Sequence, residues 1–133
     1  MVPTYKVNEA AALLGVSDDT LRRWAEAGRV TIEHSASGRQ VVPGAGLAAL
    51  AKSLAEGQDR TGSGTVSARN QLRGLVTKVT RDTVMAQVEM QAGPFRLVSL
   101  MSREAADELG LEVGCLAVAS IKATNVVVEV PPA

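Results

Sequence analysis

The stretch SARNQLRGLVTKV, residues 67–79, decides how the second half of this chain is expected to fold. It follows a glycine-rich segment and opens a run in which apolar and polar residues alternate, the period of a half-buried β-strand. In extended backbone, successive side chains point to opposite faces, so Ser67 and Arg69 share one face. A hydroxyl beside a guanidinium is a donor pair suited to an oxyanion. The stretch therefore predicts a strand whose first step can bind an anion.

The rest of the second half continues the β pattern with one interruption. LRGLVTKVTRDTVMAQVEM (72–90), FRLVSLM (95–101) and CLAVASIKATNVVVEV (115–130) are strand-like, whereas SREAADELG (102–110) predicts a short helix ending at Gly110. Roughly five strands and one inserted helix in under about 70 residues are typical of a small closed barrel of the OB type. We therefore expect an OB-like all-β barrel with one short helix.

The first half has helical periodicity. In YKVNEAAALLGVS (5–17), Val7, Ala11 and Leu14 recur at helical spacing, with Asn8 as the expected N-cap and Gly15 as the expected end. A second helix is expected directly afterwards, because only Gly15 and Val16 separate the two segments. This is the spacing of a helix-turn-helix.

The second helix and the residues after it complete a small unit. Ser17 is the expected N-cap, Asp18 and Asp19 occupy the first turn where the helix dipole favours acids, and Gly28 is the expected C-cap. HSASGR (34–39) predicts the turn of a hairpin. AGLAALAKSLAE (45–56) predicts a third helix. Its expected apolar face consists of Leu47, Leu50 and Leu54.

Composition sets the domain boundaries and excludes several classes of function. GQDRTGSG (57–64) has three glycines and no apolar side chain, so we expect an α-helical domain at 1–56, a flexible linker at 57–66 and the barrel at 67–133. One Phe, one Tyr and one Trp cannot build a base-stacking platform for single strands. A single Cys115 and a single His34 have no metal-ligand spacing, so no cation site is expected.

The charge balance and the absence of long apolar runs bear on partners and location. Lys plus Arg and Asp plus Glu both count 14. A neutral chain has no global field for polyanions, so nucleic-acid binding would need a local cluster. No apolar run is long enough for a membrane span or a signal sequence. We expect a cytoplasmic protein with no membrane partner.

NEAAALLGVSDDTLRRWAEAGRV (8–30), with its glycine-tipped hairpin and following helix, resembles the winged helix-turn-helix of MerR and excisionase-like regulators. The resemblance implies that the second helix enters the major groove of double-stranded DNA and that the hairpin follows the phosphates as a wing. Trp24 is expected in the core. The implied DNA contacts are Ser17, Thr20, Arg22, Arg23 and Arg39.

Two observations leave an alternative open for this half. Arg22 and Arg23 are also what a solvated helix face would carry. Asp18 and Asp19 could accept from cytosine amino groups, but they could equally weaken contact with phosphates. Residues 1–56 carry six basic and six acidic side chains, so a single copy is expected to bind DNA weakly. Useful affinity would require at least two copies on one duplex.

SARNQLRGLVTKV together with ELGLEVGCLAVASIKATNVVVEV (108–130) resembles the molybdate-binding Mop or TOBE domain of the molbindin type. The resemblance covers Ser67–Val130, about one copy of the domain. It implies a site for a tetrahedral oxyanion, molybdate or tungstate, between subunits. The implied ligands include main-chain N–H groups as well as side chains. They lie at Ser67, Ala68, Arg69, Ser102, Ala105, Lys122 and Ala123.

Each implied ligand has a chemical reason and some have a structural alternative. Arg69 and Lys122 would compensate a dianion, and hydroxyls and backbone amides would add short hydrogen bonds. Lys122 lies in an apolar run, where an unpaired charge is costly, which favours a ligand or partner. Ser102 is also the expected N-cap of the short helix, and Ala105 offers only its backbone.

Together the halves predict a molybdate- or tungstate-responsive DNA-binding transcriptional regulator that is not an enzyme, because no nucleophile or general base is required. Single-copy members of the family assemble as hexamers, so a homo-oligomer, a hexamer, is expected. Two alternatives remain open. One is an oxyanion storage or buffering protein whose helix-turn-helix has a role other than DNA binding. The other is an architectural DNA-binding protein whose barrel has lost its ligand.

Overall fold

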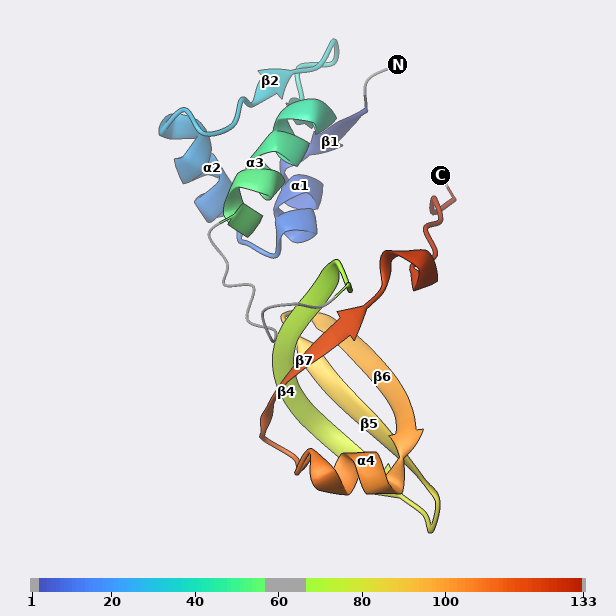
Figure 1. Cartoon of the computed structure of the whole chain (residues 1–133). Coiled ribbons are helices and arrows are strands. Elements are labelled where there is room, and N and C mark those ends of the chain that lie inside the picture. The colour runs from blue at the N-terminus through green and yellow to red at the C-terminus, as the bar shows by residue number, and fades with distance from the viewer. Residues whose placement is uncertain (1–2, 57–66, 133) are drawn as a thin grey trace. The chain divides into compact units, whose positions relative to one another are not determined.

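The computed structural model describes residues 3–56 and 67–132. The chain divides into two compact units, Met1–Asp59 and Arg60–Ala133. Their elements run from β1 to α3 and from β4 to the C-terminus (Figure 1). The predicted linker at 57–66 lies outside the described residues.

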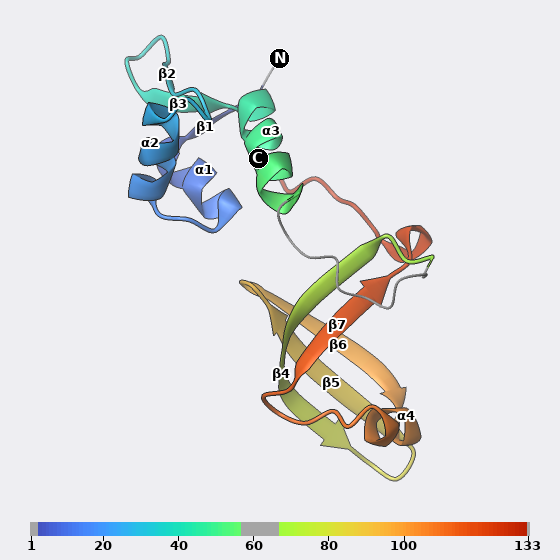
Figure 2. The same cartoon turned by 60° about the vertical axis from the view of Figure 1, so that its left-hand side comes forward.

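In the described residues, the N-terminal unit combines three helices with a small antiparallel sheet, and Figure 2 shows how they are arranged. The strand order is β1-β3-β2, so the strand after the hairpin turn lies in the middle. β1 pairs with β3 over three residues, which joins the start of the unit to the hairpin. The elements are β1 (Thr4–Lys6), α1 (Val7–Leu14), α2 (Asp18–Glu26), β2 (Glu33–His34), β3 (Gln40–Pro43) and α3 (Gly44–Glu56).

The first helix ends where the sequence predicts but begins two residues earlier. Gly15 has φ +71°, a conformation that suits glycine, and its N–H bonds back to the last turn. The prediction that Asn8 caps this helix is wrong. β1 extends to Lys6 because its ladder to β3 holds the backbone, so Lys6 is the N-cap and Asn8 lies in the first turn. The Glu9 carboxylate accepts the Lys6 N–H at 3.0 Å.

The second helix and the hairpin agree closely with expectation. Ser17 is the N-cap of α2, and its hydroxyl accepts the Thr20 N–H at 3.2 Å. The C-cap is Ala27, one residue before the predicted Gly28. The predicted hairpin is present, with His34 opposite Gln40 at the base of its turn.

One core holds the N-terminal unit together. Leu47 and Leu50 of α3 are buried and Leu54 packs against them, which confirms the predicted apolar face. Trp24 is half-buried against the same cluster, as predicted, and the Arg29 guanidinium stacks on its ring at 5.1 Å. The buried members are Val7, Ala10, Ala11, Leu21, Val30, Val42, Leu47 and Leu50.

The C-terminal unit is a curled sheet with one helix at one end (Figure 1). Its strand order is β6-β5-β4-β7, and all its ladders are antiparallel. The predicted OB-like fold class with one short helix is confirmed. The elements are β4 (Asn70–Arg81), β5 (Met85–Ala92), β6 (Phe95–Ser102), α4 (Arg103–Glu108) and β7 (Leu116–Ile121), followed by a 3-10 turn at Ala123–Asn125.

The number of strands is four in the described residues, not the roughly five that the sequence predicts. The apolar run 115–130 is broken at Lys122, where β7 ends and the 3-10 turn begins. Val126–Val130 continues without ladder bonds in the described chain, and Val127, Val128 and Val130 are largely exposed. The run is β-type in composition, but one copy of the chain pairs only its first part.

Close backbone approach allows the sheet to curl. A Cβ on Gly74 of β4 would lie 2.2 Å from the Gln91 carbonyl oxygen of β5, so only glycine fits there. The ladder between β4 and β5 also shifts register between Val76 and Lys78, and such bulges bend a strand. The curl encloses a small core of Val76, Ala86, Val88, Ala106 and Leu111.

Candidate functional site

The first group of predicted oxyanion ligands lies at the open end of the β4–β7 ladder. Asn70 is opposite Ile121, and its side-chain amide donates to the Ile121 carbonyl at 3.1 Å, which fastens this end. Arg69 directly precedes the strand β4 and Lys122 directly follows β7. Their backbones are therefore neighbours just beyond the last ladder pair. We call Ser67, Ala68, Arg69, Lys122 and Ala123 the ladder-end group.

The conformation of this group differs from the expectation in two ways. β4 begins at Asn70, so Ser67 and Arg69 lie just before the strand and not on its first step. Lys122 is exposed at the start of the 3-10 turn, so within one copy its charge carries no burial cost. Both cationic side chains are exposed.

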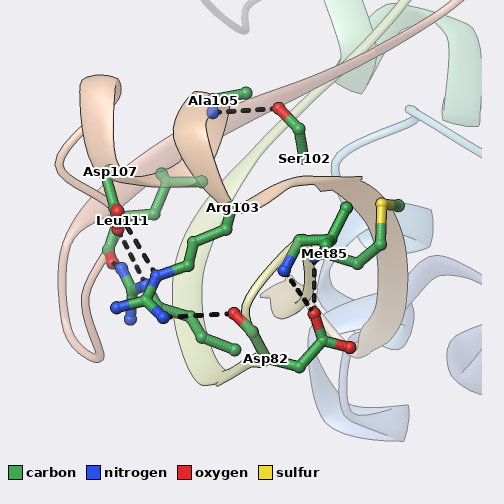
Figure 3. Close-up of polar contacts among 9 residues, drawn as sticks. Asp82, Met85, Ser102, Arg103, Ala105, Asp107 and Leu111 are labelled. Carbon is green, nitrogen blue, oxygen red and sulfur yellow. Dashed lines mark hydrogen bonds and ion pairs between the residues drawn. The ribbon is translucent and has the colours of Figure 1, made fainter.

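The second group of predicted ligands lies where β6 passes into α4. Ser102 is the N-cap of α4, as predicted, and its Oγ accepts the Ala105 N–H at 3.1 Å (Figure 3). The Ala105 N–H is therefore already satisfied within the chain. Since the Ser102 oxygen accepts this bond, its own proton is directed elsewhere and is suited to an anionic acceptor. We call Ser102 and Ala105 the helix-cap group.

An ionic network fixes the helix-cap group. Asp107 of α4 pairs with Arg81 at the end of β4 (3.0 Å) and with Arg103 (3.6 Å). Arg81 also donates to the Leu111 carbonyl at 2.8 Å, and Arg103 donates to the Asp82 carbonyl at 3.2 Å (Figure 3). These contacts tie both ends of α4 to the β4–β5 turn.

Among the titratable groups of the described residues, Asp82 in the β4–β5 turn has a clearly shifted pKa. The backbone N–H groups of Met85 and Val84 donate to the Asp82 carboxylate at 2.6 and 2.8 Å. These bonds, with a smaller contribution from the Arg103 guanidinium, outweigh desolvation and hold the pKa of Asp82 below its ordinary value of 3.8. The turn is thus stabilised by an ionised carboxylate.

The two groups do not meet within one chain. Ser102 is opposite Met85, and Ala86 is opposite Arg81, so the helix-cap group lies at the far end of β4. The ladder-end group lies at the first residue of the same strand. A straight strand of this length would span about 40 Å, and Figure 1 shows α4 and the end of β7 at opposite ends of the curled sheet. A site using both groups would need two copies of the chain.

The predicted DNA contacts lie on α2 and the hairpin, and several are joined by hydrogen bonds. Arg23 Nη2 donates to Thr20 Oγ1 at 3.2 Å, and Thr20 Oγ1 lies 3.0 Å from Ser17 Oγ. Arg22 Nη1 donates to Gln40 Oε1 at 2.6 Å, which links the helix to the hairpin. These side chains are exposed or half-buried. The two arginines project from one helix, each held by a polar neighbour.

The sequence interpretation missed the residues that hold the predicted ligands in place. Arg81, Arg103 and Asp107 support the helix-cap group, and Gln40 supports Arg22. The spacing of Arg103 and Asp107, four residues apart in a predicted helix, was an available signal for an ion pair. The contacts of Arg81 and Gln40 join segments far apart in the sequence, so no local pattern could reveal them.

The described residues offer neither a cation site nor a membrane-spanning helix. Within residues 3–56 and 67–132, no group of three or more His, Cys, Asp or Glu is placed to hold a metal ion. Among the same residues, no helix is long and apolar enough to cross a membrane. Cys115 is a free, half-buried thiol.

Comparison with known families assigns both units. A family model described as "Helix-turn-helix domain" matches residues 4–52, and one described as "TOBE domain" matches residues 66–128. The chain thus joins a helix-turn-helix domain to a TOBE domain.

Curated relatives match the TOBE half. A "Probable molybdenum-pterin-binding protein" of Haemophilus influenzae is 46% identical over 66 residues, which are 49% of this chain and 96% of that protein. "Molybdenum-pterin-binding protein 1" of Clostridium pasteurianum is 35% identical over 65 residues, 48% of this chain and 96% of the relative. Through this half, the chain belongs to the TOBE domain family, of which these molybdenum-pterin-binding proteins are relatives.

Solved structures also align with this half. A molybdate-binding protein from Sporomusa ovata is 31% identical with a TM-score of 0.48, over 49% of this chain and 97% of that one. The protein MopII from Clostridium pasteurianum is 34% identical with a TM-score of 0.46, over 50% of this chain and 100% of that one.

Proposed function

We propose that this chain is a molybdate- or tungstate-responsive DNA-binding transcriptional regulator that binds the oxyanion between copies of its TOBE domain. The observation that carries the proposal is the separation of the ladder-end and helix-cap groups at opposite ends of one sheet, in a chain that also has a helix-turn-helix domain. Relatives of the TOBE half are named for molybdenum-pterin binding. Binding of the anion would therefore be coupled to assembly.

The chemistry of the two groups suits a tetrahedral dianion. Arg69 and Lys122 supply two positive charges, and an exposed Ser102 hydroxyl supplies a donor from a second copy. This task requires charge compensation and hydrogen bonds but no nucleophile or general base. The proposed activity is therefore binding and not catalysis.

The surface of the C-terminal unit supports assembly into a homo-oligomer, for which we propose a hexamer. β6 and β7 are the two edges of its sheet. Apolar side chains along them, including Phe95, Leu100 and Leu116, are more than half exposed. Free strand edges and clustered apolar surface are typical of protein interfaces.

Regulation would follow from linkage between the two ligands. An anion that binds only assembled TOBE domains shifts the population toward that assembly. The assembly presents several helix-turn-helix domains together, and multivalency then raises their affinity for one duplex. By reciprocity, DNA would raise the affinity for the anion.

Isothermal calorimetry of molybdate and tungstate tests the anion site. Wild type should release heat, whereas Arg69→Ala and Lys122→Ala should lose about tenfold or more in affinity, since each removes a charge-assisted contact worth roughly 1.5–3 kcal/mol. Lys78→Ala is the matched control, because Lys78 is an exposed lysine of β4 that belongs to neither the ladder-end group nor the helix-cap group. Equal affinities of the wild type and the Arg69→Ala variant would overturn the site. Native mass spectrometry with molybdate gives the number of copies and anions.

A second function is favoured by one observation. Residues 1–56 carry no net charge, and Asp18 and Asp19 lie in the first turn of α2, where they oppose phosphates. A storage or buffering protein for the oxyanion does not need to attract DNA, so a neutral N-terminal half with these two carboxylates would not impair it. Mobility-shift assays on genomic fragments, with and without molybdate, separate the two. Specific binding that changes with molybdate supports the regulator, and no specific binding in either condition supports storage.

A further inference from the structure

A groove in the N-terminal unit brings together three cationic side chains from three different parts of its fold. Lys6 comes from the end of β1, Arg22 from α2 and Arg39 from the hairpin. The groove has a volume of about 310 Å³, and Asn8, Asp18 and Gln40 complete its polar lining. Its formal charge is therefore positive, although the domain as a whole is neutral. The local cluster that DNA binding requires is present here.

Gln40 organises this groove. Its side-chain oxygen accepts from Arg22 at 2.6 Å, so its amide nitrogen remains as a donor. The Arg22 guanidinium has five N–H donors and uses one in this bond, which leaves others for an anion. Because Gln40 belongs to β3, the bond fixes the guanidinium at the junction of α2 and the hairpin.

Lys6 is held at the groove by its backbone. β1 pairs Lys6 with Val41 of β3, and the Lys6 N–H donates to Glu9. Its side chain is exposed, and in the described residues it forms no ion pair with Asp18 or any other carboxylate. The Lys6 backbone is thus fixed at the groove, and its ammonium group remains available to bind an anion.

We propose that this groove binds a backbone phosphate of double-stranded DNA, with Lys6 and Gln40 as contacts in addition to those on α2 and the hairpin. This inference rests on the proposed DNA-binding function. DNA is favoured over a small anion as the ligand because every charged side chain in the groove is exposed. Exposed charges gain little from a single small anion in water, and this groove, unlike the proposed oxyanion site, is not proposed to be covered by a second copy of the chain. Duplex DNA also releases its condensed counterions when the same charges approach it.

Fluorescence anisotropy with a labelled mixed-sequence duplex of about 21 base pairs, roughly two helical turns, tests the proposal over a series of salt concentrations. Lys6→Gln should weaken binding several-fold and reduce the slope of log K against log salt by about 0.9 per copy in contact. Lys52→Gln removes an equal charge from exposed α3, outside the groove, and should change neither quantity. Gln40→Leu should also weaken binding.

A second matched pair tests the sign of the electrostatics. Asp18→Asn and Asp19→Asn each remove one carboxylate from the first turn of α2, but only Asp18 lines the groove. Asp18→Asn should therefore strengthen binding more than Asp19→Asn. Melting curves followed by the single tryptophan, Trp24, verify that each variant remains folded.

The outcomes separate this inference from the proposed function. If wild type does not bind the duplex even at the lowest salt, DNA binding itself fails and the groove proposal fails with it. If wild type binds and Arg23→Gln weakens binding, while Lys6→Gln matches Lys52→Gln in affinity and slope, only the groove proposal is overturned. Loss of affinity and slope in Lys6→Gln alone supports it.

Discussion

The two halves of this chain treat their apolar side chains in opposite ways. The N-terminal unit buries a cluster of eight residues, and among its described residues only Leu13 is a large, exposed hydrophobic side chain. The C-terminal unit has a smaller buried cluster and all the other exposed large hydrophobics. The first buries nearly all its large apolar side chains within a single copy, whereas the second leaves many of them exposed.

The difference has a structural cause. Three helices and a hairpin can enclose a core from several sides with short connections. A curled sheet of four strands leaves two edges with unpaired backbone groups, and here α4 covers only one end. The four valines within Val126–Val130 add apolar surface that one copy leaves unpaired. Function would thus divide along the same line, with contact to DNA in one half and assembly in the other.

The largest expected effect comes from a methyl group placed at the closest approach in the sheet. Gly74→Ala would put its Cβ 2.2 Å from the Gln91 carbonyl oxygen, which only backbone movement can relieve. We expect a loss above about 3 kcal/mol, beyond ordinary overpacking. Gly46→Ala, on α3 with open space around it, should instead stabilise by about 0.5 kcal/mol.

Circular dichroism and Trp24 fluorescence together locate these effects, because the tryptophan reports on the N-terminal unit alone. Gly74→Ala should remove the β signal and leave the tryptophan transition in place. A wild-type β signal in Gly74→Ala would contradict the close approach of β4 and β5. If the β transition and the tryptophan transition both shifted in Gly74→Ala, the two units would not unfold independently.

The fold was predictable where its signals are local. Caps at Ser17 and Ser102, the helix end at Gly15 and the hairpin turn all depend on residues within a few positions of each other. The Asn8 cap was wrong because a strand-to-strand ladder, a distant interaction, sets where α1 begins. The fifth strand was expected because composition shows β-type residues but not whether a partner strand exists.

The candidate site was predictable as a set of residue types and not as a geometry. Arg69 and Lys122 are brought together by the β4–β7 ladder, more than fifty positions apart in sequence. The separation of the two groups appears only in three dimensions, since it depends on the order of the strands. Whether these residues bind an oxyanion stays a prediction.

The two serine N-caps give a smaller and more discriminating comparison. Ser17→Ala and Ser102→Ala each remove a hydroxyl that accepts a backbone N–H, at 3.2 and 3.1 Å. Each should cost about 1 kcal/mol of stability in its own unit, measured by chemical denaturation. Only Ser102→Ala should also weaken molybdate binding, because its proton is proposed to reach the anion of a neighbouring copy.

The binding measurement decides what this comparison means. Equal molybdate affinity in both variants at a concentration where both are folded would reduce Ser102 to a structural cap. Weaker binding in Ser17→Ala would show that the helix-turn-helix unit takes part in anion binding, against the proposed division of roles.

The smallest expected effect concerns pH and the turn that supports α4. Since the pKa of Asp82 lies below its ordinary value of 3.8, the ionised carboxylate stabilises the folded C-terminal unit. This stabilisation is fully present above pH 3.8 and is lost as the pH falls through the lower folded value. Asp82→Asn should therefore melt below wild type at neutral pH, and the two should converge in acid.

Asp19→Asn is the control from the other half of the chain. It removes the same charge from an exposed site whose carboxylate accepts no hydrogen bond among the described residues. The shift of its β transition from that of wild type measures the general effect of one fewer negative charge. This shift is subtracted from the shift measured for Asp82→Asn. If the β transition of Asp82→Asn followed the same pH profile as that of Asp19→Asn, the Met85 and Val84 hydrogen bonds would contribute nothing. The network that holds Ser102 would then depend on Asp107 and its two arginines alone.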